Sequence, residues 1–210
     1  GYNALVTNTT GCQNTAIGSS AMQANTTGVN NISIGISSLY SNTEGNSNVA
    51  IGCGAAFSNT TANGNTAVGF RTMQLNTTGA FNTALGYNAL CSNTTATDNT
   101  AVGAYALDNN TTGTHNTAVG DQALGANTTG CNNAAVGSGS LDANTTGECN
   151  VAFGKASLTV NTTGDNNTAM GACALVYNTT ASNNTAVGFE SLKANTTGTQ
   201  NVAVGTTTLE

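Results

Sequence analysis

The chain has 210 residues and a net charge of −6, with 3 Lys plus Arg against 9 Asp plus Glu. Charged residues make up only 6% of the sequence, Pro and Trp are absent, and Asn, Thr and Gly are abundant. Three cations cannot supply the phosphate contacts on which nucleic-acid affinity depends, and no apolar run is long enough to span a membrane. The composition therefore argues against a nucleic-acid partner and against a membrane span.

Gly recurs at a constant spacing from Gly1 through Gly18 and Gly35 to Gly205, without a slip. Twelve full units and a partial one fill the chain (12 × 17 + 6 = 210). The consensus is N-T-A-V-G-x-x-A-L-x-x-N-T-T-G-x-x, as in residues 116–132, and we number its positions 1 to 17. A short fixed period indicates a solenoid, because each turn buries its apolar side only by stacking on its neighbours. We predict one repeat domain, residues 1–210, and interpret it as an excerpt of a longer array.

The segment T-A-V-G at positions 2 to 5 predicts a short strand in every turn. Alternation puts positions 2 and 4 on one face and the Ala of position 3 on the other. Position 4 is always apolar and never ionisable, so we expect it to face the core, Phe153 included. Gly at position 5 fits a corner that needs a positive φ or a close backbone approach.

The second half of each unit predicts a second packing contact and a second corner. Ala and Leu at positions 8 and 9 supply the contact. The N-T-T-G segment at positions 12 to 15 fits the corner, since Asn tolerates the left-handed conformation and bonds its own backbone two residues on. The fold class predicted is all-β: a parallel β-solenoid of twelve turns, about 58 Å long at about 4.8 Å per turn.

Asn occupies positions 1 and 12 in all twelve units. Identical Asn side chains stacked at the turn spacing can form amide ladders, each one bonding the next. We interpret both columns as structural. The ladder residues at position 1 are Asn14, Asn31, Asn48, Asn65, Asn82, Asn99, Asn116, Asn133, Asn150, Asn167, Asn184 and Asn201.

An alternative for position 12 is N-glycosylation, because its Asn begins an N-x-T sequon in eleven units. Such a sequon acts only in a secretory pathway. A glycosylated Asn would project outward and could not sit in a buried ladder, so the two interpretations exclude each other turn by turn. The candidate sites are Asn8, Asn25, Asn59, Asn76, Asn93, Asn110, Asn127, Asn144, Asn161, Asn178 and Asn195.

Apart from Glu44, every Asp, Glu, Lys, Arg and His residue lies at position 6, 7, 10, 16 or 17 of its unit. We therefore expect these variable positions to face solvent or a partner. Nine of the ten aromatic residues lie at the variable positions or beside them, and an apolar stripe along a rod suggests a partner. We favour contacts between chains over ligand binding. The candidate contact residues are Tyr2, Ile36, Tyr40, Phe57, Phe70, Tyr87, Tyr105 and Phe189.

The sequence offers no catalytic, metal or cofactor motif. The six Cys do not recur with the repeat, so they form neither a disulfide framework nor a metal site of known spacing. Cys131 and Cys149 lie one position apart on successive turns, but neighbouring positions of an extended segment point oppositely, which disfavours a bridge. His115 has no acidic pair in a fixed relation to it. We therefore expect a protein that is not an enzyme.

The motif at residues 48–52, N-V-A-I-G, and that at residues 201–205, N-V-A-V-G, resemble the N-S-V-A-I-G-x-x-A repeat of YadA-like heads of trimeric autotransporter adhesins. The resemblance implies a left-handed β-roll, a homotrimer and a surface-exposed adhesive role. The N-T-A-V-G and A-N-T-T-G arrays are also similar to repeats of phage tail fibres and bacterial surface fibres. The chain differs from the adhesin pattern by the N-T-T insertion in each turn.

The function we expect is a rigid extracellular fibre segment on a cell or virion surface. Its expected partners are further copies, as a trimer or an end-to-end fibre, and a host-surface glycan or protein. Two alternatives stay open. One is ice binding through the adjacent Thr columns at positions 13 and 14, and the other is an N-glycosylated structural filament.

Overall fold

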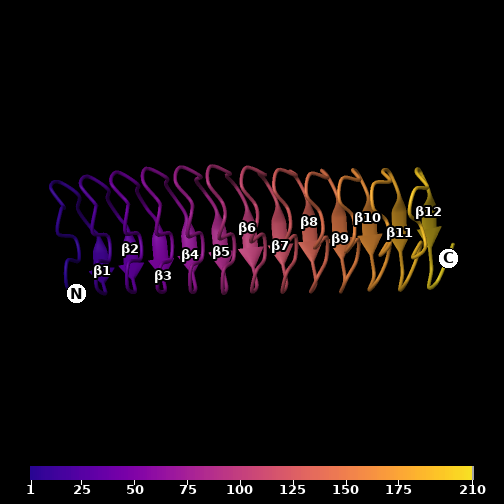
Figure 1. The fold of residues 1–210 in the computed structure, drawn as a ribbon, viewed down its shortest axis with the longest axis horizontal. Coiled ribbons are helices and arrows are strands. Elements are labelled where there is room, and N and C mark those ends of the chain that lie inside the picture. Colours follow the sequence, from indigo (N-terminus) through magenta and orange to yellow (C-terminus); the bar gives the residue numbers. More distant parts are fainter. Residues whose placement is uncertain (210) are drawn as a thin grey trace.

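The computed structural model describes residues 1–209 and is a rod with one short β-strand in each turn. Figure 1 shows the strands stacked side by side along the long axis. Their bounds are β1 Thr15–Ile17, β2 Ile32–Ile34, β3 Val49–Ile51, β4 Thr66–Val68, β5 Thr83–Leu85, β6 Thr100–Val102, β7 Thr117–Val119, β8 Ala134–Val136, β9 Val151–Phe153, β10 Thr168–Met170, β11 Thr185–Val187 and β12 Val202–Val204.

The twelve strands form one parallel sheet whose order is the chain order. Each residue pairs with the equivalent residue of the next turn: Thr100 lies beside Thr117, and Val102 beside Val119. The offset at every pair is one unit of the sequence repeat, so the repeat and the structural turn coincide. The predicted all-β parallel solenoid is confirmed.

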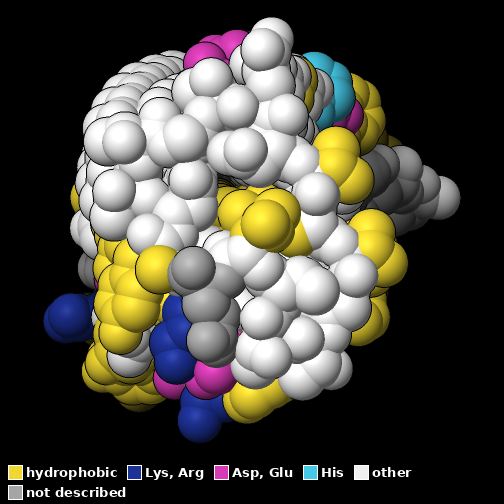
Figure 2. Space-filling model, turned by 90° about the vertical axis from the view of Figure 1, so that its right-hand side faces the viewer, with side chains coloured by type: hydrophobic (Ala, Val, Ile, Leu, Met, Phe, Trp, Pro, Cys, Tyr) yellow, Lys and Arg dark blue, Asp and Glu magenta, His cyan; other side chains and the backbone are white. Residues whose placement is uncertain are grey.

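The core of the rod is a narrow column of small and medium side chains. Ala101 at position 3, Ala106 at position 8 and Leu107 at position 9 are each 0% exposed, and the same positions are buried in nearly every turn. Figure 2 views the rod end-on, from the side of its C-terminus. It shows hydrophobic side chains at the centre of that end and in separate patches on the flanks. The predicted packing contact at positions 8 and 9 is confirmed.

The expectation that position 4 faces the core is wrong. Phe153 is 56% exposed and Met170 45% exposed, while Ala152 between positions 2 and 4 is 0% exposed. The reason is the alternation itself: in so short a strand only the middle side chain points inward. The interior of a turn is already filled by positions 3, 8 and 9, so the larger apolar side chains lie on the outside.

Gly at position 5 makes the predicted corner for both of the predicted reasons. Gly86 has a φ of 142°, a conformation that L side chains rarely adopt. A Cβ on Gly86 would also overlap the carbonyl group of Gly103 in the next turn. The close stacking of successive corners therefore requires glycine.

The second corner differs from the prediction. Asn110 at position 12 does not have a positive φ; the left-handed residues are instead at positions 7, 9 and 17, such as Tyr105, Leu107 and His115. The Asn110 side chain bonds the carbonyl of Gly113, three residues on. A left-handed non-glycine residue costs about 1–2 kcal/mol, and at Leu107 full burial, worth about 1.5–3 kcal/mol, offsets that cost.

Candidate functional site

The Asn residues of position 12 form a continuous amide ladder. In each step Nδ2 of one Asn donates to Oδ1 of the Asn in the preceding turn, at 2.7–3.2 Å. The same Nδ2 also donates to the carbonyl of position 15 within its own turn, as from Asn127 to Gly130 at 3.0 Å. Both N–H groups of each amide are thereby used, which confirms the predicted Asn ladder.

The Asn residues of position 1 form a second ladder that joins side chain to backbone. Oδ1 of Asn99 accepts from the backbone N–H of Asn116 at 2.9 Å, and Nδ2 of Asn116 donates to the carbonyl of Gly130 at 2.8 Å. This arrangement stabilises the start of every strand. An ionised Asp has no N–H group to donate, and Gln has a longer side chain, so neither could reproduce both bonds. This accounts for Asn in every turn.

A third, partial ladder at position 16 was not predicted from the sequence. Oδ1 of Asn46 accepts from the backbone N–H of Val29 at 2.8 Å, and Oδ1 of Asp165 accepts from that of Glu148 at 2.8 Å. In another turn Sγ of Cys131 takes the same place. These residues share only a short side chain with an acceptor atom. Because the residue type changes from turn to turn, the ladder is harder to recognise in the sequence than an invariant Asn.

The candidate glycosylation sites coincide with the ladder at position 12. From Asn25 to Asn178 these residues are 0% exposed, whereas Asn8 is exposed and Asn195 half-buried. The Nδ2 atom that would carry a glycan is the atom that makes both ladder bonds. Attachment at an internal turn would therefore require the amide to leave the ladder.

The side chains of positions 2 and 4 form one uncharged surface along the rod, which we call the outer face. Position 4 is apolar in all twelve units, and position 2 is always Thr, Val, Ile or Ala. Ile17, Leu85 and Val204 are 58%, 48% and 68% exposed. Twelve strands at about 4.8 Å and a width of about 10 Å give a total area of roughly 580 Å², of which the Thr residues of position 2 form a polar part.

The aromatic contact candidates form two short stacks rather than one stripe. Tyr40 and Phe57 stack with ring centroids 4.9 Å apart, and both are half-buried. Phe70 stacks on Tyr87 at 5.3 Å, and Tyr87 meets Tyr105 edge to face at 5.4 Å.

The remaining contact candidates lie apart from these stacks. Within residues 1–209 neither Tyr2 nor Phe189 makes a ring–ring contact, and Ile36 is an exposed aliphatic residue at position 6.

Arg71 lies over the Phe70 ring, 5.1 Å from its centroid, so one cation caps the longer stack.

The thiols and the single His are spread along the rod. All six Cys are free, and Cys131 and Cys149 are joined through their backbones at 3.1 Å rather than by a bridge. Burial, followed by the charge of Asp108, raises the pKa of the Cys91 thiol. His115 is exposed and lies 3.8 Å from Asp98. Residues 1–209 hold no group of three His, Cys, Asp or Glu that could bind a metal.

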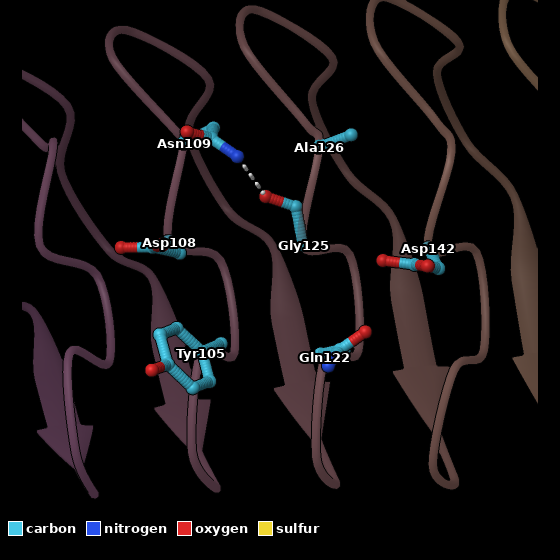
Figure 3. A pocket seen from close by; sticks show the side chains of 7 residues that line it. All are labelled: Tyr105, Asp108, Asn109, Gln122, Gly125, Ala126 and Asp142. Atoms are coloured by element: carbon cyan, nitrogen blue, oxygen red, sulfur yellow. Dashed lines mark hydrogen bonds between the residues drawn. The ribbon is translucent and has the colours of Figure 1, made fainter.

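An open hollow of about 260 Å³ lies beside Gly125 and is lined by residues of three successive turns (Figure 3). Its lining residues are Tyr105, Asp108, Asn109, Gln122, Gly125, Ala126 and Asp142. Gly125 is the one glycine at position 10, between Asp108 and Asp142 in the neighbouring turns. The missing side chain leaves the space.

The carboxylate of Asp142 leans into the hollow. Its Oδ1 lies 2.7 Å from where a Cβ of Gly125 would stand, and in Figure 3 the carboxylate points toward the Gly125 turn. Burial, and secondarily the charge of Asp121, raises the pKa of Asp142. Nδ2 of Asn109 donates to the Gly125 carbonyl at 2.9 Å and closes one side.

Comparison with known proteins identifies no relative. No protein-family profile, no curated protein and no solved structure matches the chain. The described residues contain no helix long and apolar enough to cross a membrane. The functional conclusion therefore depends on the rod and its surfaces.

Proposed function

We propose that this chain is a rigid segment of an extracellular structural and adhesive fibre, non-catalytic, in which copies associate through their outer faces. The observation that carries the proposal is the outer face itself, an uncharged, largely apolar surface that follows the strands from β1 to β12. Solenoids suit a spacer role because length grows by adding turns at nearly constant stability per turn.

The outer face supplies part of the area that association between copies needs. A stable interface buries about 800 Å² per partner, and the outer face supplies roughly 580 Å². Apolar residues at position 6, just beyond the Gly corner, such as Ile36, Phe70 and Phe189, are 38–59% exposed and can add to the interface. The resemblance of residues 48–52 to YadA-like heads favours three copies and a cell-surface or virion-surface location.

Sedimentation of the native protein tests the proposal. We expect a trimer, whose mass is three times that of the 20.7 kDa chain. End-to-end polymers would support a fibre but contradict association through the outer faces. A stable monomer of 20.7 kDa at micromolar concentration would contradict the proposal.

Ice binding is the second candidate, and the outer face supports it better than the Thr columns at positions 13 and 14. The hydroxyls of position 13 donate to the next turn, as from Thr111 to the carbonyl of Thr128 at 3.0 Å, so positions 13 and 14 do not form two free columns. On the outer face, however, Thr66, Thr83, Thr100 and Thr117 form an unbroken column beside an apolar one. A thermal-hysteresis assay tests this candidate. A solution of the protein that shows no gap between its melting and freezing temperatures would reject it.

A further inference from the structure

The hollow beside Gly125 differs from the rest of the rod, because it arises at a single glycine and does not recur with the repeat. Elsewhere position 10 carries a residue with a side chain. Here Gly125 is flanked by Ala126 at position 11, so two small residues coincide. Neither Asn ladder is affected at this turn, so the space is not a defect of the fold.

The chemistry of the lining suits a neutral, hydroxyl-rich ligand. Asp142 offers a carboxylate that accepts no hydrogen bond within residues 1–209 and can receive two neighbouring hydroxyls. Gln122 offers an amide that can both donate and accept. Tyr105 offers an aromatic ring, against which the C–H face of a ligand can pack. The carboxylates of Asp108 and Asp142 disfavour an anionic ligand.

The size of the hollow sets an upper limit on the ligand. Sites for drug-sized molecules occupy about 300–1,000 Å³, so a hollow of about 260 Å³ accommodates a single ring-sized group. Because it opens on the flank of the rod (Figure 3), the group can be the end of a longer chain that continues into solvent.

We infer that this hollow binds one pyranose ring of a surface glycan, with Asp142 accepting from vicinal hydroxyls, Gln122 bonding a third polar group and the Tyr105 ring packing against the sugar. This inference deepens the adhesive role proposed above and rests on it. It assigns the glycan contact to one turn, whereas the outer face serves association between copies.

The binding test uses the full chain in its native assembly and measures binding by saturation-transfer NMR. The probes are the methyl glycosides of glucose, galactose, mannose and N-acetylglucosamine. The first variant is Gly125→Ser, which fills the hollow; Gly125 does not have a positive φ, and the nearest atom to the new Cβ is the end of the Asp142 side chain. The second is Asp142→Ala. Gln23→Ser is the matched control, since Gln23 occupies position 10 in a distant turn.

We expect at least one glycoside to bind, and each hollow variant to weaken its affinity tenfold or more while Gln23→Ser leaves it unchanged. Sedimentation of each variant must give the wild-type assembly, which separates this inference from the proposed self-association. Glycoside binding that is unaffected by Gly125→Ser would overturn the inference. So would failure of all four glycosides to bind; binding of ethylammonium in their place would then identify a cation site.

Discussion

Nδ2 of Asn127 donates to Oδ1 of Asn110 at 2.8 Å and to the carbonyl of Gly130 at 3.0 Å. Both Asn residues are 0% exposed, so each amide in the column depends on the turns before and after it. A buried polar group without a partner costs about 1–3 kcal/mol. The ladder therefore makes the energy of every internal turn depend on its two neighbours.

Asn110→Ala should lower the free energy of unfolding by on the order of 3 kcal/mol. The substitution removes the donor to Asn93 Oδ1, the acceptor for Asn127 Nδ2 and the bond to the Gly113 carbonyl. Equilibrium urea unfolding measures the loss. Asn195→Ala is the control, because Asn195 is only part-buried and should lose about 1 kcal/mol. A loss for Asn110→Ala as small as the loss expected for Asn195→Ala would mean that the ladder contributes little.

Gly86→Ala should destabilise the rod far more than Gly125→Ala. At Gly86 the new Cβ meets the backbone of Gly103, at a φ of +142°; we expect a loss of about 3 kcal/mol. At Gly125 the nearest atom to the new Cβ is the carboxylate end of Asp142, which can rotate away, so the loss should stay below about 1 kcal/mol. Urea unfolding of the two variants side by side measures the difference, and a mild effect at Gly86 would refute the corner geometry.

The double variant Leu85→Lys with Val119→Lys should dissociate the assembly into 20.7 kDa monomers. Both positions lie on the outer face, on β5 and β7, and two buried, unpaired cations per chain would oppose association. Sedimentation reports the mass, and circular dichroism checks that the strands remain. Gln74→Lys, at position 10, adds a cation away from the outer face and should leave the mass unchanged. An intact assembly in the double variant would place the interface elsewhere.

Asp142→Asn should raise stability at neutral pH and leave it unchanged in acid. The pKa of Asp142 is raised in the folded protein, first by burial and then by Asp121, so the folded state binds this proton more tightly than the unfolded state. Linkage makes the carboxyl destabilising once the pH exceeds both pKa values, and neutral in its effect below them. Thermal melts of wild type and variant at pH 7 and pH 3 measure the difference. A variant less stable than wild type at pH 7 would contradict the sign.

The fold could be predicted because every turn repeats the same constraints. Gly86 and its equivalents mark the corner, and invariant Asn at positions 1 and 12 predicts ladders that only in-register stacking allows. The prediction for Phe153 was wrong because an apolar residue next to Ala152 is compatible with a core position and with an exposed interface. Only the volume available inside the turn decides between the two.

The candidate site was harder to predict, because it depends on one turn that departs from the repeat. Gly125 is inconspicuous in the linear sequence, although no other unit has glycine at position 10. Tyr105 and Asp142 line the hollow from the two neighbouring turns. Their side chains come close to Gly125 because the backbone fixes the direction in which each side chain points. The left-handed conformation of Leu107 carries no sequence signal at all, since Leu disfavours it.

The constant register between turns has a consequence for how the chain acquires its structure. Strand partners are never further apart in the sequence than adjacent turns, as Thr100 and Thr117 are, so the mean separation of contacting residues stays near one turn however many turns are added. Relative to 210 residues this gives a contact order of about 0.08, in the range of helical bundles that fold in microseconds to milliseconds. An all-β rod of this kind should therefore nucleate locally and grow turn by turn, without the slow loop closures that delay sandwiches and barrels.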